Sequence, residues 1–405
     1  MIKKIGIRDL HPGMYVHDLN CSWVTHPMFP TSFMVKDDDE VEHLFELGVS
    51  SLYIDTNIGG DAPDAIPASE VQESIETALH NLACTHGGAA SSSAPSSRED
   101  LTSAIRIQHE AQDTIEALMA DIRSGRHAEL ESIEPAVQGI VDSVFRNSDA
   151  LIQLGGIRTR DQYTFAHSVS VSALLAAFAR TLELGSDITR QLSIGGMLHD
   201  IGKTRVPDSI LNKPGKLSDG EFEEMRHHAQ YGVDILSEVP WISPIALQVT
   251  GLHHERYDGS GYPNRLKGSQ ISPYGQMASI VDVYDAITSV RVYHSAMSPA
   301  EAIRKLQEWA GQYFNAELVS HFIRSVGIYP LGTLARLESG RLAFVTGHSD
   351  TSLLRPQVRV VYDMRSHSKL EPCNLDLSGQ TEDKIIGYEQ PEQWELALAD
   401  YLPAA

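Results

Sequence analysis

An adjacent histidine and aspartate lie within the apolar helical run Ser193-Ile194-Gly195-Gly196-Met197-Leu198-His199-Asp200-Ile201-Gly202-Lys203, which ends near Gly202. A single buried histidine is most often a core residue whose hydrogen bonds are satisfied. The neighbouring aspartate changes this interpretation, because a buried carboxylate without a partner costs several kcal/mol. His199 and Asp200 can instead give a neutral nitrogen and a charged oxygen to one metal ion, or Asp200 can bridge two ions.

Further candidate metal ligands lie on both sides of this run. A histidine pair, His253 and His254, stands where a helical stretch enters a loop rich in glycine and proline. Such a pair could be an accident of the surface, but His167, His228 and Asp282 also lie in segments with helical apolar spacing. Five histidines and two aspartates form a ligand set for divalent ions such as Mn, Fe, Zn or Ni.

The sequence pattern of the chain changes twice, which divides it into three parts. Short extended runs and one acidic helical run occupy the first eighty residues, helical periodicity dominates from residue 99 to about 326, and alternating apolar runs such as 341–345 follow Pro330. We therefore predict a mainly α protein, a helical bundle preceded by a small α+β domain and followed by a small β-rich extension. The predicted boundaries are 1–82 for the α+β domain, 83–98 for a Ser/Gly-rich linker, 99–330 for the helical domain with its core at 150–330, and 331–405 for the extension.

Composition limits the possible functions. The 405 residues are 42% apolar, which is enough for the cores of two to three domains. The 32 basic against 54 acidic residues give a net charge of -22, which argues against binding of long nucleic acids. An anionic substrate must therefore be attracted by a local feature.

The sequence also predicts a location. The first nine residues lack the apolar stretch of a signal peptide, and the most apolar candidate span, 169–184, is interrupted by polar and charged residues. Cys21, Cys84 and Cys373 are too widely spaced for a disulfide framework or a thiolate metal site. We expect a cytoplasmic protein without a membrane span.

These motifs resemble the HD-GYP group of HD metal-dependent phosphohydrolases. The resemblance covers about residues 150–330 and rests on His199-Asp200-Ile201-Gly202-Lys203, on His253-His254-Glu255 with Asp258-Gly259-Ser260-Gly261-Tyr262-Pro263, and on Asp282-Val283-Tyr284-Asp285-Ala286. The opening segments 10–16 and 22–27 resemble an uncharacterised domain that often precedes this catalytic unit.

The resemblance implies hydrolysis of a cyclic dinucleotide, above all cyclic di-GMP, to the linear form, with further cleavage to mononucleotides left open. It implies two divalent ions per chain, Fe or Mn in preference to Ni, Zn or Mg. His228 is chosen over His227 because the family histidine stands four residues before a glycine, here Gly232. The implied metal ligands are His167, His199, Asp200, His228, His253, His254 and Asp282.

Four further residues are candidates for catalysis or substrate binding. Lys203 follows Asp200 by three positions and can reach a phosphate oxygen if the helix persists, although it can also be a solvated helix-end lysine. Asp285 can orient a ligand or accept a proton, or be a structural carboxylate. Tyr262, on what we expect to be an exposed loop, can stack on a base or contact a partner, and the resemblance suggests diguanylate cyclase domains. Tyr163 stands where some members of the family have a glutamate that binds a third metal, so two metals are predicted, with Tyr163 lining the substrate pocket or the core.

Two other functions remain open at this point: an inactive signalling module that docks a cyclase, and an HD nucleotidohydrolase acting on dNTPs or alarmones. The choice between cyclic di-GMP and cyclic GMP-AMP and the presence of a homodimer are also undecided. Because residues 1–82 show no catalytic set, the sequence predicts that a chain beginning near Glu99 retains activity.

Overall fold

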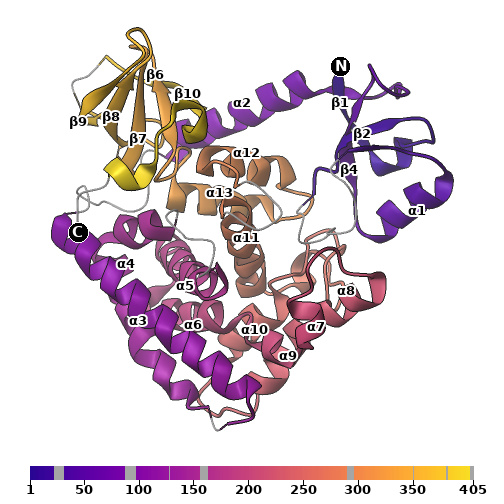
Figure 1. The fold of residues 1–405 in the computed structure, drawn as a ribbon, viewed down its shortest axis with the longest axis vertical. Helices are drawn as coiled ribbons and strands as arrows, with labels where there is room; N and C mark the ends of the chain where they lie inside the picture. Colours follow the sequence, from indigo (N-terminus) through magenta and orange to yellow (C-terminus); the bar gives the residue numbers. More distant parts are fainter. Residues whose placement is uncertain are drawn as a thin grey trace.

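The computed structural model describes residues 1–21, 32–86, 97–126, 128–155, 163–289, 296–349, 351–379 and 382–401. A small sheet domain at the N-terminus and a second sheet near the C-terminus stand at opposite sides of a helical body, and helix α2 runs between them (Figure 1). The predicted fold class, a mainly α protein with β units at both ends, is confirmed.

The N-terminal domain is a five-stranded antiparallel sheet of order β3-β2-β4-β1-β5. Its core contains Val16, Leu52 and Ile54, which are fully buried. Helix α1 begins where the Asp37 side chain accepts a hydrogen bond from the Glu40 amide, with further acids in its first turn. The elements are β1 (Ile2–Gly6), a 3-10 helix (Ile7–Asp9), β2 (Tyr15–Asp18), β3 (Phe33–Met34), α1 (Asp38–Glu46), β4 (Ser51–Asp55) and β5 (Ile66–Pro67). The sequence motif at 22–27 lies outside the described residues.

Helix α2 (Ala68–His86) belongs by its packing to the helical body. Its apolar residues Ile75 and Leu79 are buried in the same cluster as Phe178 and Trp309. Residues 83–86, which we expected at the start of a linker, form the last turn of α2. Residues 87–96 lie outside the described part, and α3 begins after a capping box at Ser97.

The helical body is organised around α5, which is buried on several sides. Val171, Leu175 and Phe178 pack into one core cluster, whereas Val169 and Ala176 pack into a second. The helices are α3 (Arg98–Arg123), α4 (Ile133–Gly155), α5 (Tyr163–Thr181), α6 (Gly185–Leu198), α7 (Asp208–Leu211), α8 (Asp219–Arg226), α9 (His228–Leu236), α10 (Pro244–Leu252), α11 (Pro273–Thr288), α12 (Pro299–Trp309) and α13 (Ala316–Val326), with 3-10 helices at Leu130–Ser132, Ile201–Arg205 and Gly268–Gln270.

The predicted β-rich extension is a second antiparallel sheet of order β10-β6-β7-β8-β9. One face contributes Ala335 and Val345 to the main core, and Leu396 covers Phe344 on the other face. The strands are β6 (Leu334–Leu337), β7 (Arg341–Gly347), β8 (Gln357–Asp363), β9 (Ser368–Asp376) and β10 (Ile385–Glu389), followed by 3-10 helices Pro391–Trp394 and Leu398–Tyr401. Of the helices in the described part of the chain, none has the length and apolar character needed to cross a bilayer.

Candidate metal centre

The structure brings all seven predicted metal ligands into one buried cluster. They come from different helices or helix ends: α5, the end of α6, the start of α9, the end of α10 and the middle of α11. All are at least 94% buried, with relative exposures of 0% for His253 to 6% for His254. These residues are His167, His199, Asp200, His228, His253, His254 and Asp282.

The donor atoms fall into overlapping groups of three. In each group the donor atoms lie within 4.8 Å of one another. The groups are His228, His253 and His254; His167, His199 and Asp282; and His199, Asp200 and His253. Asp200 stands between the first two groups: its Oδ1 is 3.5 Å from His228 Nε2 and its Oδ2 is 3.4 Å from His199 Nε2. The two oxygens of this carboxylate therefore face different groups.

Three of the histidines are oriented by the helix ends that carry them. His199 Nδ1 lies 2.8 Å from Gly196 O, His228 Nδ1 2.7 Å from Met225 O, and His253 Nδ1 2.7 Å from Thr250 O. Each Nδ1–H thus donates to a carbonyl three residues earlier, near the end of a helix, where carbonyls lack an intrahelical partner. The opposite nitrogen, Nε2, is left with its lone pair directed at the cluster.

His167 is oriented by a carboxylate instead. Its Nδ1 lies 2.7 Å from Asp285 Oδ2, and its Nε2 lies 3.1 Å from Asp282 Oδ1. Ser170 Oγ donates to the other oxygen of Asp285 at 2.5 Å. This position behind a ligand favours orientation of His167 as the role of Asp285, one of the alternatives left open by the sequence.

The electrostatics favour the protonation states of metal ligands at four of the five histidines. At the fifth, His167, burial lowers the pKa, but the hydrogen bonds to Asp282 and Asp285 outweigh it and raise the pKa. Burial lowers the pKa of His228 to about 4 and that of His253 to about 3, and it also lowers the pKa of His199 and His254. Burial raises the pKa of Asp200, but the attractions of Lys203, His199, His228 and His167 together outweigh it and hold this pKa well below its usual value. Four neutral imidazoles and an ionised carboxylate therefore share the site.

Two nitrogen atoms that are unpaired among the described residues also indicate that these residues fit a divalent metal. His199 Nε2 and His254 Nδ1 are buried polar atoms without a hydrogen-bond partner in the described part of the chain. An unpaired buried acceptor costs about 1–3 kcal/mol, whereas a metal ion can use its lone pair. The site is suited to binding divalent metal.

The comparisons with known proteins agree with this chemistry. An HD domain model matches residues 153–318, and a model of a domain of unknown function (DUF3391) matches residues 2–133. A cyclic di-GMP phosphodiesterase of Pseudomonas aeruginosa is 38% identical over 403 residues, which are 99% of this chain and 95% of that protein. This chain belongs to the HD-GYP family.

Two further relatives match shorter parts of the chain. A cyclic di-GMP phosphodiesterase of Thermotoga maritima is 36% identical over 41% of this chain and 45% of its own length. A 3'3'-cGAMP-specific phosphodiesterase of Vibrio cholerae is 35% identical over 40% of this chain and 31% of its own length.

The lysine of the HD-GYP motif faces the centre. Lys203 Nζ is 2.6 Å from Asp200 Oδ2, and the side chain is 27% exposed. The α-helix, which we expected to end near Gly202, ends at Leu198, and a 3-10 helix carries the lysine. Its ammonium is thus held between the predicted bridging carboxylate and solvent.

Tyr262 of the GYP loop is not exposed, contrary to our expectation. It is 8% exposed, its ring centroid is 4.6 Å from that of His254, and the Arg226 guanidinium carbon lies 5.2 Å from its ring centroid. The prediction of an exposed aromatic was wrong because a Gly/Pro-rich loop can fold back onto the core when its backbone is anchored there.

Glu255 provides that anchor, a role the sequence analysis missed. It is 1% exposed, and its carboxylate accepts hydrogen bonds from the Asn264 amide at 2.8 Å and the Leu266 amide at 3.0 Å. We name residues 254–266 the metal-site loop. An acid directly after two candidate ligands and before a turn-rich segment was the available signal.

Two glycines of the HD-GYP motifs allow close contacts between backbone segments around the metal centre. A Cβ on Gly202 would lie 1.9 Å from His228 O, and a Cβ on Gly261 would lie 2.3 Å from the Arg256 amide nitrogen. Gly202 therefore lets the segment after Asp200 pack against the backbone at the start of α9. Gly261 lets the second half of the metal-site loop pack against the backbone of its first residues.

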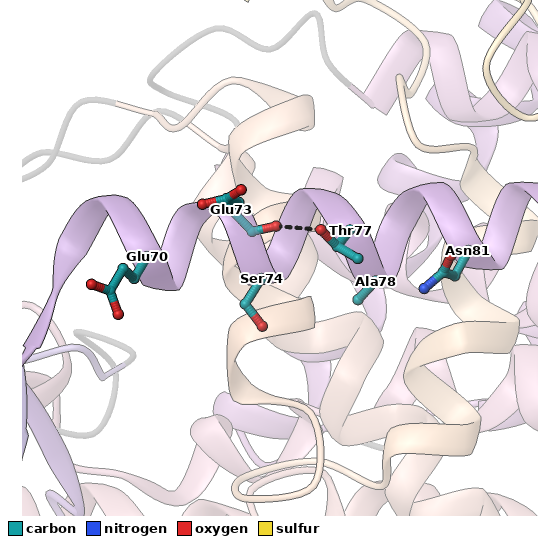
Figure 2. A pocket seen from close by; sticks show the side chains of 6 residues that line it. All are labelled: Glu70, Glu73, Ser74, Thr77, Ala78 and Asn81. Carbon is teal, nitrogen blue, oxygen red and sulfur yellow. Dashed lines mark hydrogen bonds between the residues drawn. The ribbon is translucent and has the colours of Figure 1, made fainter.

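Two features lie apart from this centre. Helix α5 begins at Tyr163, but the side chain of that residue is outside the described part, so its role stays a prediction. A hollow on one face of α2 (Figure 2) is lined by Glu70, Glu73, Ser74, Thr77, Ala78 and Asn81 and includes none of the predicted site residues.

Proposed function

We propose that this chain hydrolyses a cyclic dinucleotide, with cyclic di-GMP as the first choice of substrate and 3'3'-cyclic GMP-AMP as the second. The observation that carries the proposal is the buried set of five histidines and two aspartates, with its donor atoms in groups within 4.8 Å. The nearly full-length relative is a cyclic di-GMP phosphodiesterase, which supports the order of the two substrates.

The donor groups support two ions, with Fe or Mn preferred over Ni, Zn and Mg. His167, His199 and Asp282 would hold one ion, and His228, His253 and His254 the other. Asp200 would bridge them, since its two oxygens face different groups. Imidazole and carboxylate together suit these metals.

Charge explains how an acidic protein can hold an anion here. Two divalent ions against the carboxylates of Asp200 and Asp282 leave about two positive charges in the pocket. A cyclic dinucleotide carries two phosphodiester charges, so the site and the substrate are matched. Bound divalent ions would polarise a phosphodiester and lower the pKa of a water molecule.

The chain's own residues would then position the reaction. Lys203 can turn its ammonium from Asp200 to a phosphate oxygen, because the two groups already lie at the edge of the cluster. Asp285 would keep the His167 ring fixed through its 2.7 Å contact with Nδ1. Water adds across one P–O bond, which opens the ring to the linear dinucleotide.

The described cysteines, Cys21, Cys84 and Cys373, are free thiols, in keeping with a reducing cytoplasm. Docking of a diguanylate cyclase on Tyr262 would require surface that this buried ring does not offer. A homodimer remains a prediction of the sequence.

A nucleotide panel tests the function. Purified chain loaded with Mn or Fe under reducing conditions is incubated with cyclic di-GMP, 3'3'-cyclic GMP-AMP, dNTPs and alarmones, and products are separated by chromatography. We expect linear dinucleotide from a cyclic substrate, and loss of both turnover and bound metal in Asp200→Ala. Full metal content without turnover would favour the docking module, and turnover of dNTPs or alarmones alone would favour the nucleotidohydrolase.

A further inference from the structure

A turn of the N-terminal domain touches the metal-site loop. This turn, Leu47–Ser50, joins α1 to β4. A Cβ built on Gly48 would lie 2.6 Å from Ser260 Cβ and 3.3 Å from Ser260 O. Because Gly48 has no side chain, the backbone of this turn can pack directly against Ser260 of the metal-site loop, more than two hundred residues later in the chain.

Tyr313 joins the same turn to the same loop. Its hydroxyl accepts a hydrogen bond from the Ser50 amide at 3.2 Å and donates to Gly48 O at 3.5 Å. Its backbone carbonyl accepts from the Tyr257 amide at 2.9 Å. Tyr313, in the segment between α12 and α13, thus contacts both the turn and the metal-site loop. Its neighbour Gln312 donates to the Ser50 hydroxyl.

The N-terminal domain is held firmly enough to transmit this contact. Glu308 of α12 pairs with Lys4 Nζ at 2.7 Å and accepts from the Tyr53 hydroxyl at 2.7 Å. Trp309 Nε1 donates to Asn20 O at 3.0 Å, with Asn20 fully buried. Contacts from the strands to one helix fix the position of the sheet.

We infer that the N-terminal domain positions the metal-site loop through Gly48 and Tyr313, and so sets the geometry of the metal and substrate sites. The contact at Ser260 is two residues from Tyr262, whose amide donates to His254 O at 3.2 Å and whose ring lies on that of His254. A displacement of the turn would therefore reach a metal ligand. The inference rests on the proposed function, and it opposes the sequence-based expectation that a chain beginning near Glu99 retains activity.

A matched pair of glycine variants tests the contact. Gly48 and Gly13 belong to the same domain and have nearly equal positive φ angles, +86° and +89°. Alanine introduces comparable backbone strain at both. Only Gly48→Ala adds an atom against Ser260, because a Cβ on Gly13 meets nothing within 4 Å.

Three readouts are measured on the full chain: kcat and KM, bound metal by elemental analysis, and hydrogen exchange of peptides from the metal-site loop. We expect Gly48→Ala to lower kcat/KM by about tenfold or more, since small misplacements of a site have large effects. It should also speed exchange in residues 254–266 and weaken metal retention. Gly13→Ala should leave all three readouts unchanged.

A double variant distinguishes loss of the contact between Gly48 and Ser260 from a general destabilisation of the fold. Ser260→Gly removes the atom that Gly48→Ala would strike, so Gly48→Ala with Ser260→Gly should recover kcat/KM and slow exchange relative to Gly48→Ala alone. Equal behaviour of the Gly48 and Gly13 variants, or no recovery in the double variant, would overturn the inference.

Tyr313→Phe provides an independent test if Gly48→Ala does not fold. It removes only the hydroxyl that contacts the turn, and we expect faster exchange in the metal-site loop; unchanged exchange would overturn the inference. If the unaltered chain hydrolyses no cyclic dinucleotide, the proposed function fails, while exchange and metal retention still decide the inference.

Discussion

Replacement of Glu255 should loosen the metal-site loop without touching a proposed ligand. The carboxylate is buried and accepts from two backbone amides, those of Asn264 and Leu266, at 2.8 and 3.0 Å. Burial raises the pKa of Glu255, and the two amide hydrogen bonds oppose this rise. The carboxylate is thus held in the core by the loop that it organises.

The expected loss of stability follows from the two hydrogen bonds. Hydrogen bonds to a charged group contribute about 1.5–3 kcal/mol each, so Glu255→Ala, which leaves two amides without their acceptor, should reduce the free energy of unfolding by about 3–6 kcal/mol. Glu255→Gln keeps one acceptor oxygen and places an amide NH₂ against the second donor. We expect about half of that loss.

Chemical denaturation and steady-state kinetics measure the effect. Glu238→Gln is the matched control, because Glu238 is an exposed glutamate in the turn after α9. Both Glu255 variants should lower kcat/KM and metal retention in the same order as stability, whereas the control should behave as wild type. Wild-type stability and kcat/KM in Glu255→Gln would refute the argument that this carboxylate anchors the loop.

Three more outcomes are expected. Lys203→Ala should retain metal but lower kcat/KM by the equivalent of about 1.5–3 kcal/mol, and unchanged kinetics would return Lys203 to a solvated role. Burial lowers the pKa of His348, but the charge and hydrogen bond of Asp149, 2.7 Å away, outweigh this and raise the pKa above that of an ordinary histidine. The stability from this pair is present below the unfolded pKa and lost as pH rises through the folded one, so His348→Gln should lower Tm more at about pH 6 than at about pH 9, and equal losses would contradict this. Elemental analysis should find two metal ions per chain, because Tyr163 replaces the family's third-metal glutamate; three fully occupied ions would refute this prediction.

The sequence was sufficient for the fold class and for naming the residues that meet in the buried histidine and aspartate cluster. Helical periodicity across residues 99–326 and alternating runs after Pro330 are local properties, and the structure has helices and strands there. The adjacent pairs His199-Asp200 and His253-His254 were informative because buried polar residues are costly without a function. His228 is fully buried in the cluster, whereas the side chain of His227 is 49% exposed.

Tertiary structure alone decided how these residues act. Exposure of Tyr262 depends on where Glu255 and Gly261 seat the loop, and the contact of Gly48 with Ser260 joins segments whose spacing in the chain carries no information about distance in space. The grouping of the donor atoms also depends on packing, because backbone carbonyls at the ends of separate helices orient the rings of His199, His228 and His253. Sequence patterns record which residues are costly to bury, whereas the relative placement of helices results from side-chain packing among residues distant in the chain.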